Sequence, residues 1–178
     1  MEQQIKILKD LEPFFKDNYR SISVRQYSII SRISPPTASN LLDSLKKNSL
    51  LKMEKDRQYI FYSANIEGKL FVGLSRLYWQ DRIIKSGLIA HFSAALLSPL
   101  IIMFGSFSKA EVKPDSDIDI AIFSSSKTSS KPYLKLESYE KKLGRKIHLF
   151  IFKNAADVKS PDLLNNLHNG YILSGWWR

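Results

Sequence analysis

Two aspartates separated by one residue are the part of this sequence whose types and spacing best suit chemistry. Asp117 and Asp119 open the run Asp-Ile-Asp-Ile-Ala-Ile-Phe, and alternation along a strand places both carboxylates on one face. Two carboxylates on a buried strand repel each other and are costly to desolvate unless a cation lies between them. Magnesium that bridges them to nucleotide phosphates would remove that cost, so the pattern predicts a metal site. Alternatively, the pair is only a polar strand edge after a turn at Pro114-Asp115.

A Gly-Ser pair stands ten residues before these aspartates, at the end of a long apolar run. The run Leu100–Phe104 is continuously apolar, which predicts a buried strand that ends at Gly105-Ser106. Glycine lets the backbone approach a phosphate closely, and Ser106 can donate its hydroxyl and its N–H to phosphate oxygens. The pair is therefore predicted to bind phosphate.

The strand, the Gly-Ser pair, the ten-residue spacer and Ser116-Asp117-Ile118-Asp119-Ile120 together resemble the signature of the DNA polymerase beta superfamily of nucleotidyltransferases, especially its minimal nucleotidyltransferase branch. The resemblance covers about residues 88–175. It implies that Gly105, Ser106 and the Ser116 of the motif bind the nucleotide. It also implies that Asp117 and Asp119 hold the metals and act in catalysis.

The spacer departs from the pattern of the family, because relatives often have Arg-Gly where this chain has Lys109-Ala110. Lys109 can still reach a phosphate and is kept as a nucleotide-binding residue, but the permissive glycine is gone. The cofactors that the resemblance implies are Mg²⁺ (or Mn²⁺) and a nucleoside triphosphate, with ATP as the expected one.

The family's pattern also includes a third carboxylate on a later strand, and here the matching run is Gly144–Phe152. His148 stands where an aspartate or glutamate is expected. Imidazole suits zinc or manganese better than magnesium, and it could act as a base near neutral pH. We therefore treat His148 as a catalytic candidate, with a half-buried or surface strand residue as the alternative. The apparently incomplete carboxylate triad leaves open whether the protein is an enzyme.

The first part of the chain predicts three helices and a hairpin. Residues 5–17 and 21–33 have apolar side chains at helical spacing, with Ser23 as a cap of the second helix. Ser34 precedes two prolines and can cap a third helix that ends at Asn48-Ser49. Two β-prone runs, 50–53 and 58–62, then flank a charged turn at 54–57. This order resembles a winged helix-turn-helix domain.

In that fold the third helix enters the major groove of DNA through its N-terminal residues. The resemblance implies that the third helix contacts DNA through Thr37, Ser39 and Asn40 and, a turn later, through Lys46 and Lys47. Four further basic residues could contact phosphates: Arg25, Arg32, Lys55 and Arg57. The alternative is a protein-interaction module in which Lys46-Lys47 is only a solvated face.

The expected fold class is α+β, with three segments. Residues 1–65 form the winged helix-turn-helix domain, and residues 88–178 form a nucleotidyltransferase-like mixed sheet flanked by helices. Residues 66–87 form a linker helix with a candidate dimer face along Phe71, Leu74 and Tyr78, for which a core stripe is the alternative. The helical pattern is interrupted near Ser86-Gly87. Trp176-Trp177 is expected to pack against the domain or a partner.

Composition limits the function classes. The chain has 178 residues, no cysteine and a net charge of +10. The absence of cysteine excludes disulfide scaffolds, thiol catalysis and cysteine-ligated metal sites. The start of the sequence lacks the pattern of a signal peptide, and the longest apolar stretch, Leu88–Phe104, is too short and too polar to span a bilayer. We therefore expect a cytoplasmic protein with a polyanionic partner and no membrane contact.

Together these patterns predict a DNA-binding transcriptional regulator whose nucleotidyltransferase-fold domain binds nucleotide and metal, with weak or lost transfer. The alternative is an active, antitoxin-like nucleotidyltransferase that transfers a nucleoside monophosphate to a hydroxyl of protein or RNA. A pseudoenzyme that only mediates protein contacts is a third hypothesis. The expected partners are double-stranded DNA, nucleotide, a second copy of the chain and a toxin-type protein.

Overall fold

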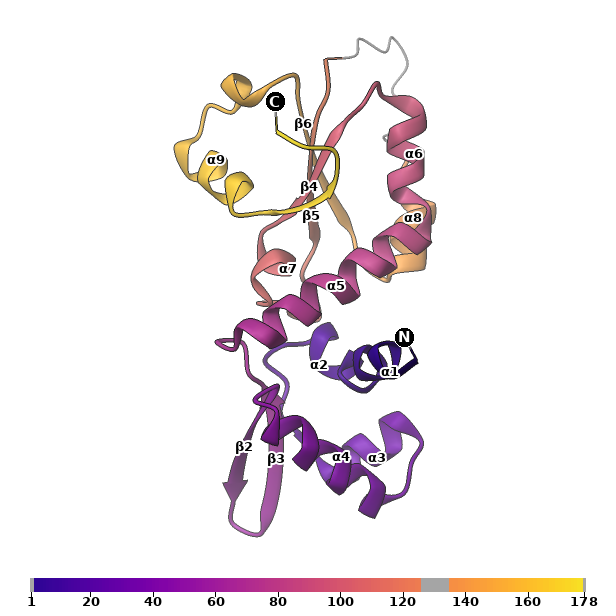
Figure 1. Cartoon of the computed structure of the whole chain (residues 1–178), viewed down its shortest axis with the longest axis vertical. Coiled ribbons are helices and arrows are strands. Elements are labelled where there is room, and N and C mark those ends of the chain that lie inside the picture. Colours follow the sequence, from indigo (N-terminus) through magenta and orange to yellow (C-terminus); the bar gives the residue numbers. More distant parts are fainter. Residues whose placement is uncertain (1, 126–134, 178) are drawn as a thin grey trace. The chain divides into compact units, whose positions relative to one another are not determined.

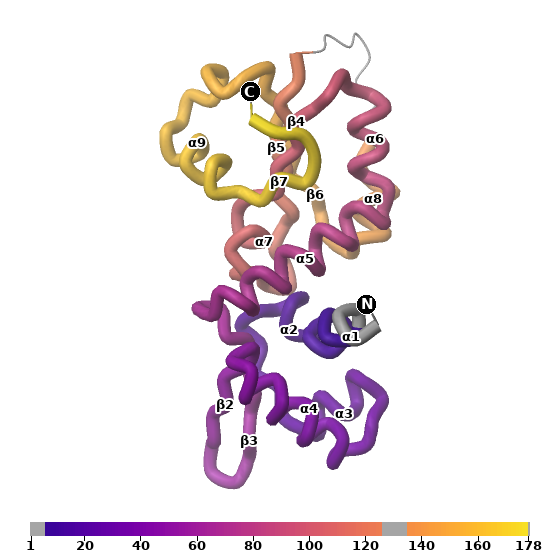
Figure 2. Tube along the Cα trace, viewed as in Figure 1, coloured from indigo at the N-terminus to yellow at the C-terminus, as the bar shows by residue number. Residues whose placement is uncertain are grey.

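The computed structural model describes residues 2–125 and 135–177, which divide into two compact units (Figures 1 and 2). The first unit contains Met1–Tyr78 and Ala110–Pro114, and the second contains Trp79–Lys109 and Asp115–Arg178. Helix α5, Lys69–Ser86, contributes to both. Compactness alone does not define an independently folding domain, so the boundaries at residues 65 and 87 stay predictions. In the described ranges no helix is long and apolar enough to cross a membrane.

The first unit begins with two short helices, α1 (Glu2–Asp10) and α2 (Glu12–Lys16), where one helix was predicted. Pro13 explains the difference, because proline lacks an N–H and its ring would clash with the preceding turn of a continuous helix. It is accommodated in the first turn of α2, and Leu11 at the junction is fully buried.

The rings of Phe71 and Tyr78 in α5 are buried against the ring of Phe15, with centroids 5.3 and 5.1 Å away. These two residues therefore belong to the core stripe that was the alternative to a dimer face. In the first unit the exposed apolar side chains of α5 are instead Leu70 and Leu77.

Two helices follow with the predicted caps. The Ser23 side chain accepts from the N–H of Gln26 at the start of α3, Val24–Ser31. The Ser34 side chain accepts from the N–H of Thr37 at the start of α4, Pro35–Lys47. These contacts satisfy N–H groups that have no partner inside the helix. The Ser34 cap therefore helps to fix the short connection between α3 and α4.

A three-stranded antiparallel sheet completes the first unit, with β1 (Ile22–Ser23), β2 (Leu51–Asp56) and β3 (Tyr59–Ala64) in the order β1-β3-β2. The hairpin of β2 and β3 was predicted, although its turn is shorter than expected and contains only Arg57 and Gln58. The Tyr62 hydroxyl of β3 donates to Asp43 of α4 at 2.6 Å, which ties the hairpin to that helix. Burial and this hydrogen bond raise the pKa of Tyr62 to about 12.

The second unit contains a four-stranded mixed sheet in the order β6-β5-β4-β7. After α5 its elements are α6 (Leu88–Ala95), β4 (Leu100–Phe104), α7 (Ser106–Lys109), β5 (Ile118–Phe123), α8 (Glu137–Leu143), β6 (Ile147–Phe152), the 3₁₀ helix η2 (Ala155–Asp157), α9 (Pro161–His168) and β7 (Tyr171–Ser174). Strands β5 and β6 are parallel, whereas β4 pairs antiparallel with both β5 and β7. The predicted interruption is Gly87, whose φ of 89° separates α5 from α6.

One face of this sheet packs against α9, while α6 and α8 lie on the other side (Figures 1 and 2). The α9 side of the core includes Phe104, Phe123, Phe150 and Leu167. Trp177 packs on Phe123 with ring centroids 5.0 Å apart, so this tryptophan contacts its own domain as predicted.

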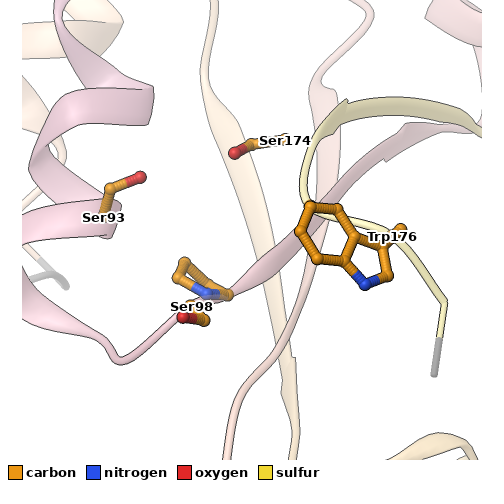
Figure 3. A pocket seen from close by; sticks show the side chains of 6 residues that line it. Ser93, Ser98, Ser174 and Trp176 are labelled. Carbon is orange, nitrogen blue, oxygen red and sulfur yellow. The ribbon is translucent and has the colours of Figure 1, made fainter.

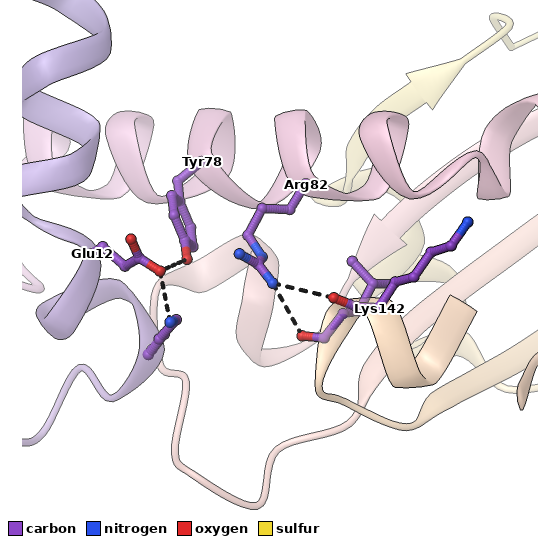
Figure 4. Close-up of polar contacts among 6 residues, drawn as sticks. Glu12, Tyr78, Arg82 and Lys142 are labelled. Atoms are coloured by element: carbon purple, nitrogen blue, oxygen red, sulfur yellow. Dashed lines mark hydrogen bonds and ion pairs between the residues drawn. The ribbon is translucent and has the colours of Figure 1, made fainter. Parts of the chain in front are cut away.

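Two sets of polar contacts stabilise the helices, one in each unit (Figure 4). In the first unit, Glu12 accepts from the Tyr78 hydroxyl at 3.1 Å and pairs with Lys16. In the second unit, the Arg82 guanidinium donates to the backbone carbonyls of Lys142 and Leu143. A cation at the C-terminus of α8 satisfies carbonyls that have no partner inside the helix and interacts favourably with the helix dipole.

Candidate functional site

The predicted Gly-Ser turn lies directly beside Asp119. Strand β4 ends at Phe104, whose partner on β5 is Asp119, and Gly105 follows with φ of 68°. A Cβ at position 105 would overlap the Asp119 carboxylate. Glycine is thus required twice, for the left-handed backbone and for the space that the carboxylate fills.

Helix α7 holds the turn in place after Gly105. Phe107 is fully buried and meets the Trp79 ring edge-on at 4.6 Å, and the Ser108 hydroxyl donates to the carbonyl of Gly105 at 2.9 Å. Lys109 is exposed, and its ammonium donates to Asn166 of α9 at 3.3 Å. Ala110 has φ of 57°, so the chain keeps a left-handed backbone where the family often has glycine.

The two aspartates occupy different positions. Asp119 lies within β5 and its side chain is 26% exposed. Asp117 precedes the strand and is exposed, and Ser116 before it is half-buried. The predicted strand therefore begins one residue later than expected, and only Asp119 is held by the ladder of the sheet.

His148 stands beside Asp119. The two residues are Cα partners in the parallel pair of β5 and β6, so their side chains share a face. The imidazole Nδ1 lies 3.4 Å from an Asp119 oxygen, and the ring packs on Phe150 with centroids 4.4 Å apart. His148 is 62% exposed. Within the part of the chain that the structure describes, an imidazole and no third carboxylate lies next to Asp119.

The pKa of Asp119 is raised above its ordinary value of 3.8, chiefly because burial removes water from the carboxylate. The nearby charge of Asp117 raises this pKa further, while His148 lowers it in part. At neutral pH the site therefore concentrates negative charge that burial disfavours. A cation at this position would compensate that charge.

Asp117 and Asp119 could hold one divalent cation shared with the phosphates of a nucleotide, because magnesium is commonly bound by one or two carboxylates and substrate oxygens. Within residues 2–125 and 135–177, no group of three or more histidine, aspartate or glutamate side chains is placed to hold a metal ion. The residues present thus fit a single shared cation and do not fit a site for two metals.

We expect Asp119→Asn to raise the free energy of unfolding at neutral pH by about 1 kcal/mol, since it removes a desolvated charge. The native carboxylate of Asp119, with its raised pKa, binds a proton more tightly than the unfolded one. Wild-type stability should therefore rise as pH falls from neutral through that raised pKa, and the variant should lose this dependence. Thermal unfolding across this pH range measures both effects.

Asp117→Asn is the matched control, because Asp117 is exposed and its replacement should change stability by less than about 0.5 kcal/mol. If Asp119→Asn were instead the less stable variant at neutral pH, hydrogen bonds to the carboxylate would outweigh its desolvation.

The predicted DNA-contact residues lie in the first unit. Arg25, Arg32, Thr37, Asn40, Lys46, Lys47, Lys55 and Arg57 are exposed, and Ser39 is half-buried. The structure brings Thr37 to Lys47 onto α4, and Lys55 and Arg57 onto the hairpin. The Thr37 hydroxyl is already hydrogen-bonded to Ser34 at 2.8 Å.

A pocket of about 350 Å³ lies at the other end of the second unit's sheet. Ser93, Ser98, Pro99, Ser174, Gly175 and Trp176 line it (Figure 3). Pro99 precedes β4 and Ser174 ends β7, whereas Gly105 and Asp119 lie at the opposite strand ends. This pocket is therefore separate from the site of Gly105, Asp119 and His148. Trp176 is 69% exposed at the pocket, unlike its neighbour Trp177.

Two residues near the site were not predicted. Asn166 of α9 accepts a hydrogen bond from Lys109. No local sequence pattern predicts this contact, because the two residues lie far apart in the sequence. Lys146 is exposed and its carbonyl accepts from the N–H of Ile118, so it directly precedes β6 beside the start of β5. Alternation along the run Gly144–Phe152 predicts that its side chain shares the face of His148, although Lys146 was given no role in the predicted site.

The mixed sheet, the Gly-Ser turn after its buried strand and the aspartate on the next strand resemble a nucleotidyltransferase-type domain. Residues 99–166 match the family model described as "Polymerase beta, Nucleotidyltransferase". The matched range contains β4, β5 and β6 and hence Gly105, Asp119 and His148. No curated protein matches the chain. The predicted resemblance is thus confirmed for this domain, while the winged helix-turn-helix stays a prediction.

Proposed function

We propose that the protein is a DNA-binding regulator in which residues 1–65 form a winged helix-turn-helix and the nucleotidyltransferase-type domain binds a nucleoside triphosphate with a divalent cation. One observation carries the DNA-binding half: β1 pairs with β3, and with α1 and α2 together in the place of a first helix the element order becomes helix, strand, two helices and hairpin. A winged helix-turn-helix uses this order to present its second and third helices and its wing to DNA. A homodimer and a toxin-type partner stay predictions.

The backbone of two arginines supports binding to a polyanion. Arg32 at the end of α3 and Arg57 at the hairpin turn both have φ of 54°. A left-handed backbone disfavours residues other than glycine, asparagine and aspartate by about 1–2 kcal/mol. The chain therefore carries a positive side chain at two positions where asparagine would be easier to accommodate. The same backbone occurs at Ser49, Ser98 and Ala110, so the support comes from the charge of the two arginines and not from the strain itself.

The nucleotide-binding half rests on the packing of Gly105 against Asp119. The Gly-Ser turn offers backbone N–H groups and the Ser106 hydroxyl to phosphate, with Lys109 held nearby by Asn166. A cation bound by Asp119 and Asp117 would neutralise phosphate charge. Transfer would need this charge compensation during in-line attack, and the imidazole of His148 supplies no negative charge for a second metal. We therefore infer that the domain binds the nucleotide and catalyses nucleotidyl transfer weakly or not at all.

Two measurements test the proposal. Mobility shift with a random-sequence DNA duplex at low salt should show binding that weakens steeply as salt increases, because phosphate contacts release counterions. Calorimetry with a non-hydrolysable ATP analogue and a divalent cation should show binding that Asp119→Ala abolishes. Absence of any shift at low salt would contradict the regulatory half. Incorporation of nucleotide that Asp119→Ala abolishes would identify an active transferase instead.

We expect Arg57→Asn to weaken DNA binding without weakening the fold. The substitution removes one phosphate contact, which should lower affinity roughly tenfold at about 0.1 M salt and reduce the salt slope by about 1. Asparagine accepts the left-handed backbone, so the free energy of unfolding should stay the same or rise by up to about 1 kcal/mol. Titrated mobility shifts and thermal unfolding measure the two effects separately.

Arg20→Asn is the control, because Arg20 is exposed but lies outside α3, α4 and the hairpin. It removes the same charge and should leave affinity within about twofold. Equal losses in the two variants would mean that net charge, and not the wing, binds the DNA.

A further inference from the structure

The pair of Asp119 and His148 is held in place by the sheet. Both residues lie in register on parallel strands, and Phe150 packs on the imidazole ring. The Nδ1 of His148 and an Asp119 oxygen are 3.4 Å apart. Two donors of different chemistry, one nitrogen and one oxygen, therefore lie close together on one face of the sheet. The exposure of His148 leaves this place open to exchange with solvent.

The separation of these atoms agrees with a tetrahedral cation. Two ligand atoms about 2.1 Å from a tetrahedral metal lie about 3.4 Å from each other. Neighbouring oxygens about 2.1 Å from an octahedral Mg²⁺ lie about 3.0 Å apart. The spacing also suits a direct contact of the imidazole with the carboxylate while no cation is bound, and it is compatible with zinc coordination without movement of either strand.

The chemical type of the two donor atoms also favours zinc. Imidazole nitrogen is a common zinc ligand, whereas Mg²⁺ takes oxygen ligands almost throughout. With His148 in place of Asp117 as the second protein ligand, a tetrahedral ion is two ligands short, and in the described ranges no group of three acidic or histidine side chains is placed to supply a third. Phosphate oxygens at the adjacent Gly-Ser turn can supply the missing ligands.

We propose that Asp119 and His148 bind a zinc-type divalent cation together with the phosphates of the nucleotide, and that His148 makes the site favour this cation over Mg²⁺. The inference rests on the nucleotide binding proposed above. It assigns His148 a role as a ligand that sets metal preference, in the position where the family has an acid.

Calorimetry on the full chain tests the preference, with a non-hydrolysable ATP analogue titrated in the presence of Zn²⁺ or of Mg²⁺. Wild-type protein should bind the analogue about tenfold or more tightly with Zn²⁺. His148→Ala should remove most of this difference, and His148→Asp should reverse it, because aspartate adds an oxygen ligand suited to Mg²⁺. His168→Ala is the control, since His168 is another exposed histidine of the same unit and should leave the preference unchanged.

Absorption by Co²⁺, used in place of Zn²⁺, gives a second readout. Four-coordinate Co²⁺ absorbs visible light far more strongly than six-coordinate Co²⁺, so the nucleotide complex of the wild type should be strongly coloured and that of His148→Ala pale. Thermal unfolding verifies that the variants are folded. We expect them to fold, because the side chain of His148 is largely exposed.

The outcomes separate the two proposals. If the analogue binds equally well with Zn²⁺ and Mg²⁺, or if His148→Ala keeps the preference, the metal assignment is wrong and nucleotide binding stands. If the analogue binds with neither cation, the proposed nucleotide binding fails and this inference fails with it.

Discussion

Gly105→Ala is expected to lower the free energy of unfolding by about 3 kcal/mol and to abolish nucleotide binding. The left-handed backbone at Gly105, with φ of 68°, costs a residue with a Cβ about 1–2 kcal/mol. The new Cβ would also overlap the Asp119 carboxylate, so this partly buried side chain would have to shift. Overpacking of this kind typically costs about 1–3 kcal/mol. Chemical denaturation of the full chain measures the sum.

Gly144→Ala separates the two costs. Gly144 has the same φ of 68°, but a Cβ there would meet nothing within 4 Å. It also belongs to the second unit, at the C-terminus of α8. This variant should therefore lose only the backbone contribution, about 1–2 kcal/mol. If both variants lost the same free energy of unfolding, the Asp119 carboxylate would move aside at position 105 without an energetic cost.

A double-mutant cycle identifies the carboxylate as the cause. In an Asp119→Ala background the overlap is gone, so Gly105→Ala should cost only its backbone part. The coupling free energy between the two sites should be about 1–2 kcal/mol, which is in the range for residues in contact. Additive losses would exclude the Asp119 carboxylate as the obstacle and would contradict the close packing on which the proposed nucleotide site rests.

Local signals predicted most of the first unit. Ser23 and Ser34 indicated where two helices begin, because each side chain caps the helix through contacts within three residues. Strand β1 had no such signal. Its two residues become a strand only through pairing with β3, where Ile22 opposes Tyr62 far along the chain. Pairing between distant segments depends on the tertiary fold, which local residue patterns do not encode.

The same limit applies to the candidate site. His148 and Phe150 are two residues apart on one strand, so alternation alone puts them on one face, where their rings pack together. Alternation could not say which residue of another strand lies opposite. The register that sets His148 against Asp119, and the contact of Gly105 with that carboxylate, arise from strand pairing between separate parts of the chain. The sequence therefore indicated candidate residues for a site but not the contacts between them.

Neutralising three basic residues of α4 and the hairpin is expected to reduce DNA affinity about 10²–10³-fold at about 0.1 M salt. The variant is Lys46→Gln/Lys47→Gln/Arg57→Gln, and all three side chains are exposed. Each lost phosphate contact lowers the salt slope by about 0.9, so the slope should fall by nearly 3. Mobility shifts at several salt concentrations give both the affinity and the slope.

A second triple variant, Lys6→Gln/Lys9→Gln/Arg20→Gln, removes the same charge from exposed positions outside α4 and the hairpin. Long-range attraction to DNA depends on total charge and is screened within about 10 Å at 0.1 M salt, whereas direct contacts depend on position. The second variant should therefore bind DNA nearly as well as wild type. If both variants lose affinity equally, the basic surface attracts DNA without orienting it, and α4 has no role as a recognition helix.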